Sequence, residues 1–216
     1  MQQLFPDLWQ TQTEHPFAGV TTHAYFLTRP DGNILFYGTG VQEELQPIRD
    51  LGGIVRQYLS HRDEAGPALA TIKQTFGSAL CCHALEAKAI GSYCPVDVTF
   101  DAHETHLGNI EVIPTPGHTS GSTCFVYRSP HGKAYLFTGD SIYPDGQSWG
   151  TRVQFFAGGR KSDLKHSLGL LRDLQPDVVI SSASVGRSPV QTMSAGEWRA
   201  IADDAIGRLY LLRADN

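Results

Sequence analysis

The sequence predicts an α/β fold in which helices flank a sheet. Strand-like and helix-like segments alternate in the order β-α-β-α-β between residues 34 and 82. Several apolar runs end in short polar turns that contain His, Asp or Glu. The chain has 216 residues, of which 41% are apolar and 18% charged, as in ordinary globular domains. We therefore expect one domain over residues 1–216, with a sizeable core.

The first half of the chain supplies a hairpin and the alternating run. Two segments rich in β-branched and aromatic side chains flank a Pro-Asp-Gly-Asn turn, which indicates a hairpin. Helical spacing of apolar residues before glycines indicates the helices that follow. The expected segments are strands at 20–27 and 34–37, a helix at 42–51, a strand at 54–59, a helix at 69–76 and a strand at 78–82.

The second half continues with short strands and two helices. A long aromatic loop is expected at 146–159. Ser162 can cap the helix that follows it, and Ser194 with Glu197 predicts a capping box for a last helix that ends near Arg213. The expected strands lie at 96–100, 110–113, 123–127, 134–137 and 177–180.

Charge and composition exclude several classes of partner. The net charge is −5, and the chain lacks the clustered Lys and Arg that neutralise nucleic-acid phosphates. It also lacks an apolar run of membrane-spanning length. Residues 1–7 have neither a basic nor an apolar segment, so we expect no signal peptide. The four cysteines form no CxxC pair, which indicates reduced thiols and a cytoplasmic protein.

Adjacent Cys81, Cys82 and His83 do not predict a metal site. Successive strand residues point to opposite faces of a sheet, so these three side chains do not converge on one ion. Buried thiols are the favoured interpretation.

Three polar turns carry the candidate functional residues. The first reads Leu-Ser-His-Arg-Asp-Glu-Ala-Gly over residues 59–66. The second reads Pro-Gly-His-Thr-Ser-Gly-Ser over residues 116–122, and the third reads Thr-Gly-Asp over residues 138–140. Turns at strand ends meet at one edge of a sheet, where ligands and catalytic groups usually lie.

These turns, in this order, resemble those of the metallo-β-lactamase superfamily. The overall sequence pattern is similar to that of its glyoxalase II-like hydrolase branch. The Gly-Gly-Arg at residues 158–160 and the His-Ser-Leu at 166–168 add to the resemblance. It covers nearly the whole chain. It implies an αββα sandwich of two mixed sheets flanked by helices, with divalent metal at one edge.

The resemblance implies an altered form of the family motif HxHxDH. Without a gap, the motif falls on Leu59, His61, Asp63 and Glu64, so that Leu59 and Glu64 replace histidines. With a two-residue deletion, His61 is instead the first histidine. In either alignment the third family histidine matches His118.

One further family ligand and one further family aspartate are lost, while one ligand is kept. The bridging aspartate of the family matches Asp140, but the histidine of its PGHG turn falls on Ala183. The aspartate of an early strand-end turn falls on Gly38. The resemblance therefore implies an incomplete site in which His61, His118 and Asp140 bind one divalent ion, with zinc favoured over iron, or in which no metal binds.

Three functions follow from this ligand set. A metal-dependent hydrolase of an ester or thioester is favoured if the protein is active, with Asp63 or Glu64 orienting water or moving a proton. The alternatives are a non-catalytic relative that binds a ligand or partner in the old cleft, and a mononuclear iron oxidoreductase similar to persulfide dioxygenases. The sequence leaves open whether the protein is an enzyme.

A small-molecule substrate is expected, and aromatic residues are the candidates for its binding wall. They are Tyr143, Trp149, Phe155 and Phe156. Core packing beneath a long loop is the equal alternative for these side chains. Assembly into a homo-oligomer is left open.

Overall fold

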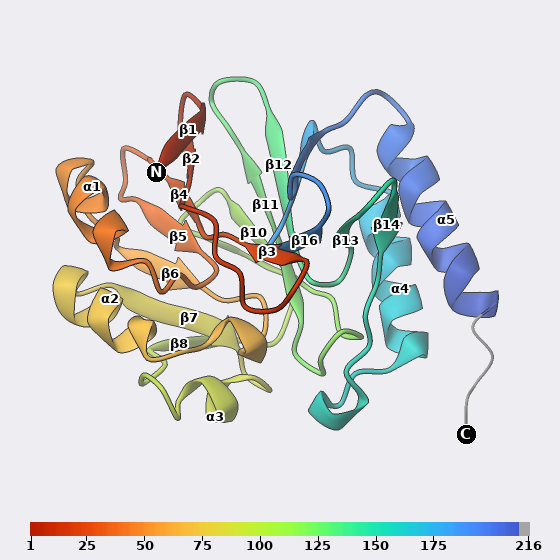
Figure 1. Ribbon diagram of the computed structural model, residues 1–216, viewed down its shortest axis with the longest axis horizontal. Helices are drawn as coiled ribbons and strands as arrows, with labels where there is room; N and C mark the ends of the chain where they lie inside the picture. The colour runs from red at the N-terminus through yellow and green to blue at the C-terminus, as the bar shows by residue number, and fades with distance from the viewer. Residues whose placement is uncertain (212–216) are drawn as a thin grey trace. The chain divides into compact units, whose positions relative to one another are not determined.

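The computed structural model describes residues 1–211, and its contacts divide the chain into two compact units. The first unit is Met1–Ala102 and the second begins at His103 (Figure 1). The end of the last helix predicted near Arg213 lies outside the described residues. None of the helices in the described part of the chain is long and apolar enough to cross a bilayer.

The first unit contains a seven-stranded mixed sheet. Its strands pair in the order β1 (Gln2–Phe5), β2 (Leu8–Gln10), β4 (Tyr25–Leu27), β5 (Ile34–Phe36), β6 (Arg56–Tyr58), β7 (Ala79–His83) and β8 (Val98–Phe100). Pairing is antiparallel up to β5 and parallel from β5 to β8. The strand predicted at 20–27 is wrong in one respect, because it is broken into β3 (Val20–Thr22) and β4. The parallel strands bring their carboxyl ends, including the turn after β6, to one edge.

Helices of the first unit cover one face of its sheet through apolar contacts. The helices are η1 (Gln42–Glu44), α1 (Leu45–Asp50), η2 (Arg62–Glu64), α2 (Ala68–Phe76) and α3 (Ala87–Ile90). Leu35 of β5 packs with Ile48 of α1 and Ile72 of α2. Leu59 and Leu80 pack in a neighbouring cluster that includes residues of α2 and α3. Alternate strand residues therefore face the helices, as the pleat requires.

The second unit contains a six-stranded mixed sheet. Its strands pair in the order β17 (Val190–Thr192), β15 (Val178–Ser181), β12 (Ala134–Gly139), β11 (Thr123–Arg128), β10 (Ile110–Pro114) and β9 (Glu104–His106). Only β12 and β15 pair in parallel within this sheet of the described chain. The carboxyl ends of these two strands therefore lie side by side, at Asp140 and Ser182.

A small hairpin occupies part of the predicted aromatic loop. The strands β13 (Tyr143–Asp145) and β14 (Ser148–Gly150) pair antiparallel, and β13 also pairs with β16 (Ala183–Val185). The prediction of a loop throughout 146–159 is therefore wrong over β14. A short η3 (Phe155–Ala157) follows the hairpin.

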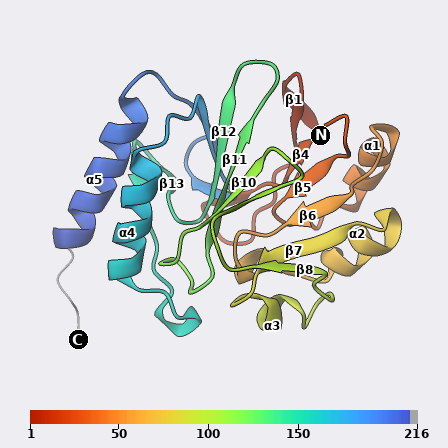
Figure 2. The same ribbon diagram turned by 180° about the vertical axis from the view of Figure 1, so that it is seen from behind.

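Two long helices pack against each other in the second unit, α4 (Lys161–Arg172) and α5 (Glu197–Leu211), and lie side by side in Figures 1 and 2. Trp198 Nε1 donates a hydrogen bond to the carbonyl of Leu171 at 2.7 Å. The predicted cap at Ser162 is wrong: the helix begins after Arg160, and the Ser162 hydroxyl donates to Asp163 inside the first turn. The Glu197 carboxylate does accept hydrogen bonds from the amide and hydroxyl of Ser194.

Candidate metal ligands

His61 lies in the turn that follows β6, and contacts between Arg62 and Glu86 hold this turn in place. His61 has extended backbone dihedrals, φ −162° and ψ 172°, and η2 begins at the next residue. Arg62 donates from its backbone nitrogen and from Nε to Glu86 Oε2, at 3.1 and 2.5 Å, and Glu86 is fully buried. The hydrogen bond to Glu86 is the main cause of a raised Arg62 pKa. This ion pair, in which Arg62 is partly exposed, ties the turn to the start of α3.

The two nitrogens of the His61 ring have different surroundings. Nδ1 lies 2.8 Å from the hydroxyl oxygen of Ser60 and 3.2 Å from Glu64 Oε1. Nε2 lies 3.8 Å from Asp63 Oδ2. The ring is 2% exposed, whereas the side chain of Asp63 is 39% exposed. His61 and Asp63 therefore form one pair of prospective ligands, buried on the imidazole side and open to solvent on the carboxylate side.

Glu64 binds the residue that precedes His61. Its Oε1 accepts a hydrogen bond from the Ser60 hydroxyl at 2.5 Å, and its Oε2 accepts one from the Ser60 amide at 2.8 Å. The side chain of Glu64 is only 6% exposed. Both of its carboxylate oxygens are thus engaged inside the turn.

The backbone of Glu64 also explains why the aspartate of the early strand-end turn is replaced by Gly38. A Cβ atom added at Gly38 would lie 2.3 Å from the carbonyl oxygen of Glu64, and carbon does not approach oxygen that closely. An aspartate at this position would therefore have to displace the turn that holds His61. Leu59, the other altered position nearby, is fully buried in the cluster with α2 and α3, so an imidazole there would lie among apolar side chains.

The second unit presents His118 from a turn packed on α4. Gly117 has φ +143°, and an added Cβ would lie 2.3 Å from Cα of Leu164. The hydroxyl of Ser167 donates to the carbonyl of Pro116 at 2.7 Å. The amide of Gln154 donates to the carbonyl of His118 at 2.8 Å. Because only glycine permits this close approach to the helix, Gly117 lets the turn that carries His118 pack directly on α4.

Hydrogen bonds also set the tautomer of the His118 ring, which is fully buried. Nδ1 lies 2.9 Å from the carbonyl oxygen of Arg152. A carbonyl only accepts, so Nδ1 carries the proton and Nε2 the lone pair. Nε2 lies 4.0 Å from Asp140 Oδ2 and 3.3 Å from the side-chain amide nitrogen of Gln154.

Asp140 stands at the carboxyl end of β12 and is held by a residue from the end of β15. Its Oδ1 accepts a hydrogen bond of 2.6 Å from the hydroxyl of Ser182. The side chain is 21% exposed. Ser182 precedes Ala183, so a hydroxyl that orients the aspartate lies beside the position where the family ligand is lost.

The donor atoms of each unit fit a divalent metal ion. Zinc is bound by histidine nitrogen and carboxylate oxygen at about 2.0–2.2 Å, so two ligands of one ion lie roughly 3–4 Å apart. His61 with Asp63, at 3.8 Å, and His118 with Asp140, at 4.0 Å, are spaced in this way. In both pairs it is Nε2 of the histidine that faces the carboxylate.

The aromatic candidates for substrate binding fall into three environments. Tyr143 is half-buried, and burial together with the nearby Asp140 carboxylate raises its pKa. Trp149 lies in the core, where its ring meets that of Trp198 edge to face at 6.2 Å. Phe155 and Phe156 of η3 are 68% and 87% exposed. Core packing therefore describes Trp149, and a substrate role for the other three stays a prediction.

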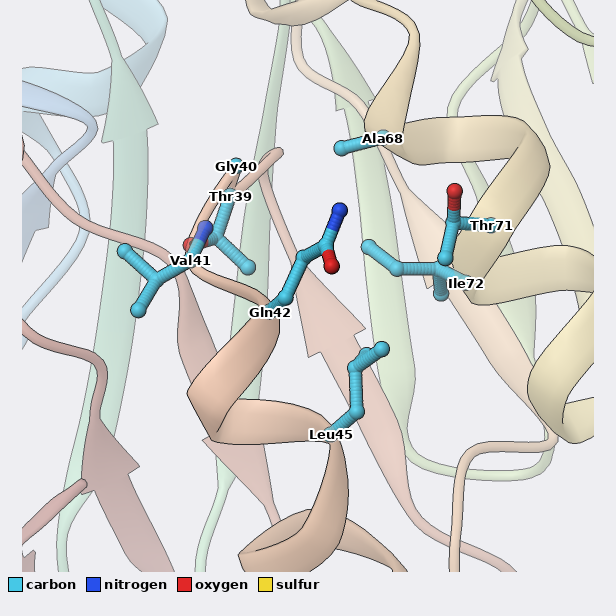
Figure 3. Close-up of a pocket in the computed structure, with 8 residues that line it drawn as sticks. All are labelled: Thr39, Gly40, Val41, Gln42, Leu45, Ala68, Thr71 and Ile72. Carbon is cyan, nitrogen blue, oxygen red and sulfur yellow. The ribbon is translucent and has the colours of Figure 1, made fainter.

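Two other features carry no ligand chemistry. Burial raises the pKa values of Cys81 and Cys82 to about 12, so both remain thiols rather than thiolate ligands at neutral pH. The start of η1 and residues of α2, among them Gln42 and Ile72, line a hollow of about 10 Å³, shown in Figure 3. That is room for a single water molecule rather than a substrate.

The sequence interpretation missed the residues that hold the ligands. Ser60 and Ser182 were visible only as neighbours of motif positions, although Ser60-His61 matches the Thr-His of the family. Gln154 and the carbonyl of Arg152 gave no signal, because their contacts with His118 join residues that are more than 30 positions apart.

Comparisons with known proteins agree with this architecture. A metallo-beta-lactamase from Pontibacter korlensis is 20% identical, with a TM-score of 0.73 and 97% of each chain covered. ETHE1 from Myxococcus xanthus is 18% identical, with a TM-score of 0.70, covering 95% of this chain and 91% of its own. A metallo-beta-lactamase family protein from Thermus thermophilus is 17% identical, with a TM-score of 0.68, covering 97% of this chain and 81% of its own. No curated protein matches the chain in sequence.

These likenesses show the fold, and they confirm the predicted fold class of mixed sheets with flanking helices. Residues 58–183, more than half of the chain, match the sequence model of the metallo-beta-lactamase superfamily. The chain belongs to the metallo-beta-lactamase superfamily.

Proposed function

We propose that the protein is a metal-dependent hydrolase of a small ester or thioester, in which His61, His118 and Asp140 bind one divalent ion, zinc in preference to iron. The observation that best supports this proposal is the spacing of two histidine–carboxylate pairs. Nε2 of His61 lies 3.8 Å from Asp63 Oδ2, and Nε2 of His118 lies 4.0 Å from Asp140 Oδ2. Membership of a superfamily of metal-binding proteins supports the same reading.

Residues around the ligands supply the remaining chemistry. A zinc ion bound here would polarise a substrate carbonyl and lower the pKa of a bound water to about 7. Asp63 is the proton carrier, because its partly exposed carboxylate can exchange protons with solvent. Tyr143 stays protonated at neutral pH, since its pKa is raised, and its phenol donates a hydrogen bond to the substrate. Phe155 and Phe156 offer the substrate an apolar surface.

Metal analysis tests this proposal directly. Protein purified without chelator is expected to hold about one equivalent of zinc, measured by elemental analysis and checked by titration of the stripped protein. Iron in place of zinc would favour the oxygenase alternative. Less than about 0.1 equivalent of any divalent metal, with none taken up on titration, would refute the enzyme proposal.

One observation favours the non-catalytic alternative. The side-chain amide nitrogen of Gln154 lies 3.3 Å from Nε2 of His118, on the side of the ring where an ion would bind. A protein that binds its ligand without metal would keep this hydrogen bond permanently.

Replacing Gln154 tests whether its side-chain amide competes with a metal ion for Nε2 of His118. If metal competes with the amide, Gln154→Ala should raise zinc affinity by about two- to tenfold, the worth of one hydrogen bond. Gln46→Ala, an exposed change in α1, is the control and should leave the affinity unaltered. A lower affinity in Gln154→Ala would show instead that Gln154 helps to hold the ion.

Other expectations stay predictions. They are the kinship with the glyoxalase II-like branch, the single domain over residues 1–216, the cytoplasmic location and any homo-oligomer. The proposal needs only a small-molecule substrate.

A further inference from the structure

We propose that Glu64 and Ser60 form a hydrogen-bond relay that fixes the proton of His61 on Nδ1 and keeps Nε2 as the metal-binding nitrogen. Glu64 is therefore a positioning residue that acts through His61. The inference deepens the proposed function and rests on it for the identity of His61 as a ligand. It concerns residues of the first unit alone.

The direction of the first hydrogen bond follows from chemistry. Oε1 of Glu64 lies 2.5 Å from the hydroxyl oxygen of Ser60, and a carboxylate only accepts hydrogen bonds. A serine hydroxyl has one proton. That proton is therefore given to Glu64, and the short distance is typical of a bond from a hydroxyl to a charged acceptor.

The direction of the second bond follows from the first. The Ser60 oxygen, having donated its proton, can only accept from Nδ1 of His61 at 2.8 Å. Oε1 of Glu64, 3.2 Å from the same nitrogen, is also an acceptor. The neutral imidazole consequently carries its proton on Nδ1. Its lone pair lies on Nε2, which faces Asp63 at 3.8 Å.

The turn holds the Glu64 carboxylate in this orientation. The Ser60 amide donates to Oε2 at 2.8 Å, so both oxygens are engaged by one residue. The carbonyl of Arg62 accepts from the amide of Ala65 at 3.0 Å, and Arg62 is itself bound to buried Glu86. A relay fixed on both sides can set the histidine tautomer, and outer partners of this kind alter metal affinity by about 10- to 100-fold.

The substitution Glu64→Gln reverses the relay while nearly preserving shape. The amide oxygen can still accept from the Ser60 backbone, but the amide nitrogen now donates to the Ser60 hydroxyl oxygen. The hydroxyl proton then loses its carboxylate acceptor, and the nearest acceptor left to it is Nδ1 of His61, so we expect the imidazole proton to move to Nε2. A purely structural role for Glu64 predicts no change of tautomer.

The experiment measures the His61 tautomer by ¹⁵N NMR in metal-free protein and zinc affinity by titration. For Glu64→Gln we expect the proton on Nε2 and a zinc affinity about 10- to 100-fold weaker. Ser60→Thr keeps the hydroxyl and should keep the wild-type tautomer. The matched surface change Glu43→Gln, an exposed glutamate in η1, should alter neither quantity. Circular dichroism verifies that each variant is folded.

Three outcomes are decisive. A Glu64→Gln protein that retains the Nδ1 proton overturns the relay, even if its zinc affinity falls. If that protein does not fold, Glu64→Ala replaces it, because it removes the carboxylate that accepts both from the Ser60 hydroxyl and from Nδ1: a tautomer mixture supports the relay, and an unchanged single tautomer overturns it. If the wild-type protein binds no zinc, while Glu64→Gln still moves the His61 proton to Nε2, the proposed function is refuted and the relay stands. The two failures are therefore distinguishable.

Discussion

Replacing His118 with alanine is expected to lower bound zinc from about one equivalent to below about 0.1. The variant loses the ring whose Nδ1 is oriented by the carbonyl of Arg152 and whose Nε2 faces Asp140. Two-coordinate binding by the remaining groups is too weak to retain the ion through purification. His61→Ala should give the same loss if both histidines serve one ion.

The comparison of the two variants tests the stoichiometry. His103→Ala removes an imidazole that is 61% exposed and should leave the metal content unchanged. His118→Ala also leaves buried polar groups without their partner, at a cost of about 1–3 kcal/mol, so its stability is measured by denaturant unfolding. Loss of only half of the metal in each variant would show that the two units bind separate ions and would contradict the single-ion proposal.

Replacing Gly117 with alanine should be among the most destabilising changes in the second unit. The residue has φ +143°, and its added Cβ would meet Cα, Cβ and N of Leu164 at 2.3–2.4 Å. Two of these atoms belong to the backbone of α4 and cannot rotate away. Strain and overpacking together are expected to cost about 3 kcal/mol, which lowers Tm by about 6–12 °C for a chain of this size.

The control separates the clash from the backbone strain. Gly132, in the turn between β11 and β12, has φ +82° and nothing within 4 Å of an added Cβ. Gly132→Ala should therefore cost only the backbone term, about 1 kcal/mol. Equal losses of Tm in the two variants would contradict a role for the contact with α4. Zinc affinity should fall in Gly117→Ala alone, because the clash displaces His118.

Local pattern determined much of the fold in advance. The β-α-β-α-β order at residues 34–82 is visible in the sequence because apolar spacing and glycine punctuation are local properties. The positions of His61, His118 and Asp140 in strand-end turns were visible for the same reason. Boundaries were less secure, as the break before β4 and the false cap at Ser162 show, because short strands and caps depend on the neighbours they meet.

By itself, the sequence determined the superfamily, the strand-end turns and the residue types able to bind metal. Only the tertiary structure decided which atoms face one another. It turned Glu64 toward Ser60, placed Trp149 in the core and set Gly38 against the carbonyl of Glu64. Hydrogen-bond direction and burial depend on backbones that are distant in sequence, such as the Arg152 carbonyl that sets the proton of His118. No periodicity within a segment encodes such contacts.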